Sequence, residues 1–196
     1  MAALRCITWR QPGVAAVFQA VEPTDAEIAT HAAALAQAYN DPHNAPMLGT
    51  TEAMSAPDVV AHYTTMNAAG ARQFHLFVDS TLVGDADLRN FDPIAHTCEF
   101  AFMIAQRDTQ GRGIGTRFAL MIHHVAFTQL SLERIYVAIV PANHASRRVM
   151  EKLGYRLDGS AAARASADDS NDNTMSVDRA TFLAAHQLQA IDISVR

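Results

Sequence analysis

A cluster of glycines in the second half of the chain constrains the fold more than any other feature. Gly111, Gly113 and Gly115 follow an apolar run at 97–105 and precede a stretch at 114–130 whose apolar side chains recur at helical spacing. Glycine has no Cβ, so the main chain of such a turn can approach a ligand closely. The first amides of a helix lack intrahelical partners and lie at the positive end of its dipole. The order strand, glycine turn, helix therefore predicts an anion site, typically for phosphate.

Two common phosphate-binding motifs do not match this turn. A P-loop requires Lys followed by Ser or Thr after its last glycine, whereas Thr116 and Arg117 stand here. The dinucleotide fingerprint G-x-G-x-x-G also differs from the G-x-G-x-G of this segment. A structural alternative stays open at this point, in which the glycines serve only a tight connection between strand and helix.

The remaining sequence alternates between strand and helix patterns, which predicts one mixed α/β (α+β) domain over residues 1–196. Strands are expected at 4–9, 14–21, 74–78, 82–88, 97–105, 134–140, 155–157 and 174–178. Helices are expected at 26–39 (capped by Thr24 or Asp25), from Ser55 to Gly70, and at 114–130, 143–153 and 180–189. Segments 40–55 and 89–96 are interpreted as loops. Residues 1–13 are expected to form an N-terminal extension strand, 158–173 a flexible loop and 180–196 a C-terminal helix and tail.

Composition excludes several classes of protein. Apolar residues make up 49% and charged residues 18%, which is typical of a soluble globular enzyme. The formal charge of -5 disfavours a nucleic-acid partner, because neutralising phosphates requires a basic face. No apolar stretch approaches the ~20 residues of a membrane span, and no signal peptide is recognised, so the expected location is cytoplasmic. The two cysteines and nine histidines have no metal-ligand spacing, and no metal is expected.

Two segments at a characteristic separation resemble the GNAT acetyltransferase superfamily. Residues 110–115, Gln-Gly-Arg-Gly-Ile-Gly, are similar to its Q/R-x-x-G-x-G/A signature. Residues 143–155 are similar to the family's N-x-x-S-x-x-x-x-x-x-L-G-F/Y segment, and the likeness is closest to the branch of ribosomal-protein N-terminal acetyltransferases and their small-molecule relatives. The resemblance is strong over 97–157 and rests on element order alone over 14–96.

The resemblance implies a GNAT-like fold: a mixed, mostly antiparallel central sheet, splayed between its fourth and fifth core strands and flanked by helices. The pantetheine arm of acetyl-CoA, the cosubstrate, would enter the gap and pair with a strand edge as an additional strand. The implied cofactor-binding residues lie at the end of that strand, in the glycine turn and at the later helix: Met103, Ile104, Ala105, Gln110, Gly111, Arg112, Gly113, Gly115, Thr116 and Asn143.

The implied reaction is direct transfer of an acetyl group from the thioester to a primary amine. Glu99, the single charge in an apolar strand, is the candidate base, directly or through water; the alternatives are that it faces solvent or pairs with an arginine. Ser146 is the candidate proton donor to the thiolate, the alternative being a local capping or packing role. Many family members use a Tyr one turn later, where this chain has Met150. Tyr155 is expected in the core.

The acceptor is left open among a peptide or protein N-terminal amine, a polyamine and a small amine such as an amino acid or antibiotic. The acidic composition favours a cationic acceptor, and Asp168, Asp169 and Asp172 are candidates to attract it, unless they belong to a solvated loop. No membrane partner is expected, and a homodimer is left open. Two other classes remain: a non-catalytic acyl-CoA-binding or regulatory module of the same fold, and a nucleotide-dependent kinase-like enzyme, against which the missing Lys after Gly115 argues.

Overall fold

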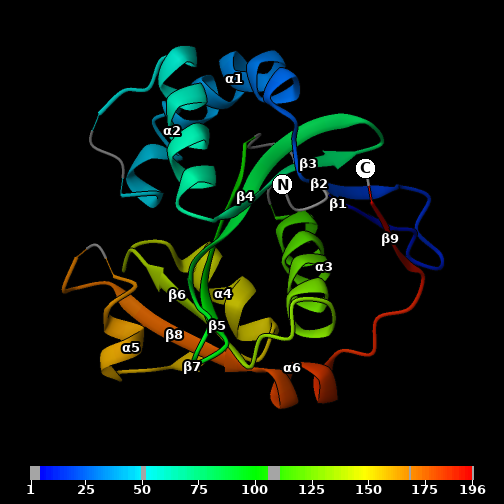
Figure 1. The fold of residues 1–196 in the computed structure, drawn as a ribbon, viewed down its shortest axis with the longest axis vertical. Coiled ribbons are helices and arrows are strands. Elements are labelled where there is room, and N and C mark those ends of the chain that lie inside the picture. Colours follow the sequence, from blue (N-terminus) through cyan, green and yellow to red (C-terminus); the bar gives the residue numbers. More distant parts are fainter. Residues whose placement is uncertain (1–4, 50–51, 106–110, 168, 196) are drawn as a thin grey trace.

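A computed structural model describes residues 5–49, 52–105, 111–167 and 169–195 (Figure 1). Its strands are β1 (Arg5–Trp9), β2 (Phe18–Val21), β3 (Arg72–Val78), β4 (Thr81–Asp92), β5 (Thr97–Ile104), β6 (Arg134–Ile139), β7 (Arg156–Leu157), β8 (Asn173–Asp178) and β9 (Ile191–Val195). Its helices are α1 (Asp25–Tyr39), the 3-10 turn η1 (Ala45–Met47), α2 (Ala56–Ala68), α3 (Ile114–Thr128), α4 (His144–Lys152), α5 (Ala161–Arg164) and α6 (Arg179–Ala185). None of the helices within these ranges has the length and hydropathy that a membrane crossing requires.

The strands form a single sheet in the order β7-β8-β6-β5-β4-β3-β2-β1-β9. All neighbours are antiparallel except β5 and β6, which run parallel. That parallel pairing covers only three residue pairs, from Thr97 opposite Arg134 to Glu99 opposite Tyr136. Beyond Glu99 the two strands separate, so the splay implied by the resemblance is confirmed.

Helices cover both faces of the sheet, and each face has its own core. One core joins the sheet to α3, α4 and α6 through side chains such as Phe118, Met150 and Phe182. The other joins α1 and α2 to the opposite face, where Leu35 and Tyr63 are fully buried. In Figure 1, α1 and α2 lie together at the top of the view, while α3 and α4 lie beside the lower half of the sheet.

The helix starts follow the predicted caps. Thr24 and Glu27 form a reciprocal capping box at α1, and Ser55 and Asp58 form another at α2. Each box satisfies amides that the helix itself leaves without partners, which explains why these boundaries are predictable from the sequence.

A buried histidine–tyrosine pair fixes the packing of α3 against the segment after α4. His123 Nδ1 lies 2.7 Å from the carbonyl oxygen of Ala119, which only accepts, so Nδ1 donates and Nε2 accepts from the Tyr155 hydroxyl at 2.7 Å. Burial lowers the pKa of His123 to about 3, so the ring is neutral. Tyr155 is fully buried, which confirms the prediction that it belongs to the core.

Three expectations for the chain organisation require correction. The first half of the loop expected at 89–96 is strand, because β4 continues to Asp92 and pairs with β5 in a hairpin. The segment 158–173, expected as a loop throughout, contains α5, where Ser160 caps the helix and Ala163 is buried.

The expected C-terminal helix is shorter, and a strand follows it. Helix α6 ends at Ala185, and β9 pairs antiparallel with β1 at the edge of the sheet. Trp9 Nε1 donates to the carbonyl oxygen of Gln189 at 3.0 Å and joins the intervening connection to β1. The segment 191–195, Ile-Asp-Ile-Ser-Val, alternates apolar and polar side chains, so the sequence held a strand signal there.

Candidate active site

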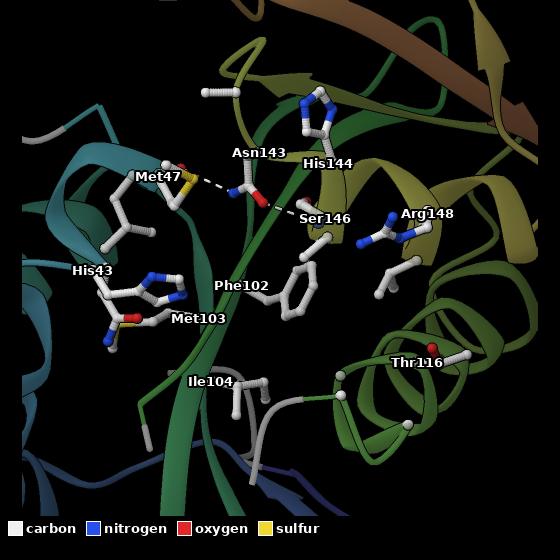
Figure 2. Close-up of a pocket in the computed structure, with 18 of the residues that line it drawn as sticks. His43, Met47, Phe102, Met103, Ile104, Thr116, Asn143, His144, Ser146 and Arg148 are labelled. Atoms are coloured by element: carbon white, nitrogen blue, oxygen red, sulfur yellow. Dashed lines mark hydrogen bonds between the residues drawn. The ribbon is translucent and has the colours of Figure 1, made fainter. Parts of the chain in front are cut away.

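Two cavities adjoin the gap between β5 and β6. The first, of about 570 Å³, is lined by the glycine turn, the end of β5 and α4, and we call it the turn cavity (Figure 2). The second, of about 670 Å³, is lined by acidic residues of β4 and β5 and by β6, and we call it the carboxylate cavity. Six residues line both cavities: Met47, Leu48, Phe102, Met103, Asn143 and Ser146. The two cavities therefore share a wall at the splay.

The glycine turn presents main chain to the turn cavity. Gly111 and Gly113 have φ of 75° and 77°, in the left-handed region, and a Cβ at Gly111 would meet no atom within 4 Å. Gly113 is the N-cap residue of α3, so the first amides of that helix lie at this turn. A Cβ at Gly115 would lie 3.0 Å from Cε2 of Phe102, so glycine there allows α3 to pack closely on β5.

The side chains next to the glycine turn differ in what they contact. Thr116 lines the turn cavity together with the three glycines. Arg117 supports the turn from behind, because its Nη1 donates to the carbonyl oxygen of Arg112 at 3.2 Å and its Nε donates to Gln11 Oε1 at 3.0 Å. Arg112 is not among the residues that line the cavity, and its expected place beside a phosphate stays a prediction. Gln110 lies outside the described residues.

The main-chain groups of β5 that point towards the gap belong to other residues than expected. Ala105 N donates to Val83 O at 2.7 Å, and Ala105 O accepts from Asn44 Nδ2 at 3.2 Å, so both main-chain groups of Ala105 are occupied. Main-chain direction alternates along a strand, so Met103 also points towards β4, whereas Phe102 and Ile104 point towards the gap. The expected pairing of a ligand with the main chain of Met103 and Ala105 would require these bonds to exchange, and it stays a prediction. Met103 contributes its side chain to both cavities instead.

Helix α4 forms the opposite wall. Its N-cap residue Asn143 accepts from Ser146 N at 3.0 Å through Oδ1 and donates to Met47 O at 3.1 Å through Nδ2 (Figure 2). The side chain of Asn143 thus joins η1 to α4, and its expected hydrogen bonds to pantetheine would require these contacts to exchange. Arg148 and Lys152, one turn apart on α4, also line the turn cavity and bring positive charge to it.

Glu99 lines the carboxylate cavity, and its carboxylate is already bound. Oε1 accepts from Arg89 Nη2 at 2.8 Å and Nε at 3.1 Å, and Oε2 accepts from Asn90 Nδ2 at 2.9 Å. Of the alternatives considered for Glu99, pairing with an arginine is the one that the structure shows. Its role as a base stays a prediction.

A second carboxylate of the cavity, Asp85 on β4, is held by two tyrosines. The hydroxyl of Tyr39 from α1 and that of Tyr63 from α2 both donate to Asp85 Oδ2, the latter at 2.9 Å. Burial raises the pKa of Asp85 to about 6, against the lowering effect of these hydrogen bonds. The same burial, together with the charge of Asp85, raises the pKa of both tyrosines, which therefore act as donors.

The third carboxylate, Asp87, lies between Asp85 and Arg89 on the same side of β4. Its Oδ1 is 3.6 Å from Arg89 Nε and is buried without a hydrogen bond to any described residue. Burial raises the pKa of Asp87 to about 7, against the lowering effect of Arg89. Asp169 and Asp172 also line this cavity, whereas Asp168 lies outside the described residues.

Comparison with known proteins identifies this arrangement. A family model described as "Acetyltransferase (GNAT) domain" matches residues 18–156, which include both cavities' sheet and helix walls. The chain belongs to the GNAT acetyltransferase family. The match is consistent with the two sequence segments that resembled this family.

Curated relatives of the chain are acetyltransferases by name. YdaF of Bacillus subtilis (strain 168), provisionally named a ribosomal N-acetyltransferase, is 30% identical over 54% of this chain and 55% of its own length. Spermidine N(1)-acetyltransferase of Escherichia coli (strain K12) is 27% identical over 45% of this chain and 47% of its own length. The chain thus spans about half the length of the curated relatives that it matches.

Solved GNAT structures share the fold. Aminoglycoside acetyltransferase AAC(6')-Ib in complex with coenzyme A has a TM-score of 0.69 at 17% identity, covering 91% of this chain and 98% of that protein. Mycobacterium smegmatis RimJ in complex with CoA-disulfide has a TM-score of 0.70 at 19% identity, covering 92% and 93%. At these identities the likeness concerns the fold.

The turn cavity suits the coenzyme of this family. Gly111 leaves open space where a side chain would stand, and the first amides of α3 lie beside it. Two cations of the facing helix α4 also line the cavity. Main-chain amides and cations together are the groups that bind phosphate oxygens. Acetyl-CoA therefore fits as cosubstrate.

Several site residues were not predicted from the sequence. Asp85 and Asp87 were missed, although the alternation Val-Gly-Asp-Ala-Asp-Leu within an expected strand places both on one side. Arg148 and Lys152 were missed because their direction depends on how α4 is rotated against α3, which sequence spacing alone does not give.

Proposed function

We propose that this GNAT-family chain transfers the acetyl group of acetyl-CoA to a primary amine, of a small molecule or of a peptide or protein N-terminus. The observation that carries the proposal is the wall shared by the two cavities. A thioester entering through the turn cavity and an amine entering through the carboxylate cavity would meet at Phe102, Met103 and Ser146. Bringing two reactants together in this way supplies a large part of the rate enhancement in such transfers.

The proposed cofactor contacts follow the geometry of the turn cavity. The pyrophosphate would accept hydrogen bonds from main-chain amides between Gly111 and Thr116. Arg148 and Lys152 would add charge from α4. The pantetheine arm would run along the edge of β5 towards Ser146, beside Phe102 and Ile104.

The chemistry then proceeds in three steps. The acceptor's ammonium group loses a proton, and the neutral nitrogen forms a bond to the thioester carbonyl carbon. The carbon–sulfur bond breaks, the second proton leaves the nitrogen for water, and the departing thiolate takes up a proton from a hydroxyl group that regains one from water. Ser146 is the proposed donor of that last proton, because its side chain lies at the junction of the two cavities.

The acceptor class is proposed to be cationic. The cavity on the acceptor side is lined by several carboxylates, among them Asp85, Asp87 and Glu99. Relatives and fold neighbours named for spermidine and aminoglycosides support a cationic amine. Because of the likeness to YdaF, an amine of a ribosomal protein is another acceptor to be tested.

Acetyl-CoA binding and turnover test the proposal. Calorimetry with CoA and acetyl-CoA measures binding, and thiol release measures turnover with spermidine, kanamycin A and a short peptide with a free α-amine. The expected result is binding of both coenzymes and acetylation of at least one amine. Binding without any acetylation would instead identify a non-catalytic acyl-CoA-binding module, and absence of binding would reject the proposal entirely.

Ser146→Ala tests the proton donor. We expect kcat to fall about tenfold or more, with unchanged acetyl-CoA affinity, because the hydroxyl acts on the leaving thiolate. Ser194→Ala on β9 is the matched control, since it removes a hydroxyl at the far edge of the sheet. Equal kcat for Ser146→Ala and the control would restrict Ser146 to a structural role on α4.

A further inference from the structure

Three carboxylates share one side of β4 and β5 and line the carboxylate cavity, yet their partners differ. Asp85 lies opposite Met103, Asp87 opposite Ala101, and Glu99 opposite Arg89 in the antiparallel register. Residues directly opposite in such a pair point to the same face of the sheet. The three acids therefore form one row that leads away from the shared wall with the turn cavity.

Two members of the row have their hydrogen-bonding capacity engaged by the protein. Asp85 receives the hydroxyls of Tyr39 and Tyr63. Glu99 receives Arg89 through two nitrogens and Asn90 through its amide. Both oxygens of the Glu99 carboxylate are thus occupied by donors from the protein.

Asp87 is the exception among the three. Its side chain is 16% exposed, it lines the cavity, and it accepts no hydrogen bond from the residues that the structure describes. Its nearest cation, Arg89 Nε, is 3.6 Å from Oδ1, beyond hydrogen-bonding distance, and Arg89 itself is oriented towards Glu99 at 2.8 Å. A buried carboxylate without donors is costly for a fold to keep, and such groups concentrate at functional sites.

We infer that Asp87, rather than Glu99, receives the proton of the acceptor's ammonium group, and that the neighbouring acids hold the cationic acceptor beside it. The inference rests on the proposed acetyl transfer and adds the residue that prepares the nucleophile. In the balanced step, the N–H bond of the ammonium group breaks and Asp87 becomes a carboxylic acid. The lone pair left on nitrogen then attacks the thioester carbonyl, and Asp87 returns its proton to water after product release.

The surroundings of Asp87 suit a proton acceptor. Asp85 and Arg89 flank it on β4, Glu99 faces it from β5, and His62 of α2 and Tyr39 of α1 line the same cavity. Burial and the charge of Arg89 lower the pKa of His62, which leaves Arg89 as the nearby cation. With a pKa of about 7, Asp87 is better matched to an ammonium group than an ordinary carboxylate, because proton transfer becomes easier as the two pKa values approach each other.

Four variants separate Asp87 from Glu99. Asp87→Asn removes the proton acceptor, Asp87→Glu keeps a carboxylate, Glu99→Gln removes the competing candidate, and Asp192→Asn on β9 is the matched control on an exposed strand. Thiol release is measured with spermidine, kanamycin A and the peptide amine between about pH 6 and pH 9, and calorimetry with acetyl-CoA accompanies each variant.

We expect Asp87→Asn to lower kcat by roughly 10²-fold or more, with unchanged acetyl-CoA affinity and full activity in Asp192→Asn. The wild type should lose activity as the pH falls through about 7, and this limb should persist in Glu99→Gln and disappear from Asp87→Asn. Asp87→Glu should recover part of the rate, which a purely structural role would not predict.

Three outcomes overturn the inference. They are an Asp87→Asn enzyme within twofold of the wild type, a pH limb that vanishes in Glu99→Gln instead, and acetyl-CoA binding without turnover of any of the three cationic amines by the wild type. If acetyl-CoA does not bind at all, calorimetry shows that the proposed function itself has failed, and the inference fails with it.

Discussion

The two cavities at the splay are built from different materials. The turn cavity presents main chain: the recognition groups that we propose there are the amides around Gly111 and Gly113, with cations added by α4. The carboxylate cavity relies on side chains, three of which share one row along β4 and β5. Main-chain recognition leaves glycines at fixed spacing, whereas side-chain recognition depends on the register that places residues together. This difference explains why the coenzyme is identifiable from the sequence while the acceptor is not.

The largest expected effect concerns the free energy of unfolding, which the buried Asp87 carboxylate of the carboxylate cavity lowers at neutral pH. Asp87 has a native pKa of about 7, above its ordinary value of 3.8, so the unfolded chain releases a proton that the native protein retains between these values. Native stability therefore falls as pH rises through this window, and the full cost is present above pH 7.

Asp87→Asn removes that cost. Its advantage in unfolding free energy over the wild type should grow by roughly 2–3 kcal/mol between pH 5 and pH 8, as measured by urea unfolding at each pH. A stabilised but slow enzyme is the signature of a residue kept for function. A pH-independent difference would show that Asp87 is ionised at low pH and would remove the contrast between Asp87 and its paired neighbours.

A smaller effect, on acetyl-CoA affinity, tests whether main-chain amides of the turn bind the coenzyme. Gly111→Ala and Gly70→Ala form a matched pair, because both positions have positive φ and both leave open space for a Cβ. Each variant should lose about 1–2 kcal/mol of stability from left-handed strain. Only Gly111→Ala should also weaken acetyl-CoA binding, by about tenfold, in calorimetry. Equal affinities in the two variants would contradict main-chain recognition at the turn.

The smallest effect concerns the charges on α4. Arg148→Gln and Lys152→Gln should each weaken acetyl-CoA binding by about two- to fivefold, since exposed ionic contacts contribute ~0.2–1 kcal/mol. The loss should shrink as salt is raised. Arg147→Gln is the control on the same helix, because Arg147 pairs with Glu151 and does not line the cavity. If Arg147→Gln weakens acetyl-CoA binding equally, the charges of α4 act through the overall electrostatic potential and make no local contact with the ligand.

Local rules predicted most of the fold. The caps at Thr24 and Ser55 marked helix starts because a side chain and an amide only three residues away determine them. The missed strand β9 depends on β1, nearly the whole chain length away, and no local rule reports that pairing.

The same distinction applies to the site. The glycine turn was predicted by spacing, and the splay by resemblance. Glu99 accepts hydrogen bonds from Arg89, whereas Asp87 has an ion pair with Arg89 at 3.6 Å and no hydrogen bond from it. This difference follows from the cross-strand register of β4 and β5. Register is set by the hairpin and by burial of the opposite face, so the sequence alone does not resolve which acid is left without a hydrogen-bond donor.

The contact between Trp9 and the connection before β9 gives the molecule a built-in optical reporter. The chain has one tryptophan, which is 5% exposed, bonded to Gln189 and several strands away from the splay. Its intrinsic fluorescence therefore registers whether the C-terminal strand is seated on the sheet edge. A change of emission on adding acetyl-CoA would reveal that the two ends of the sheet communicate.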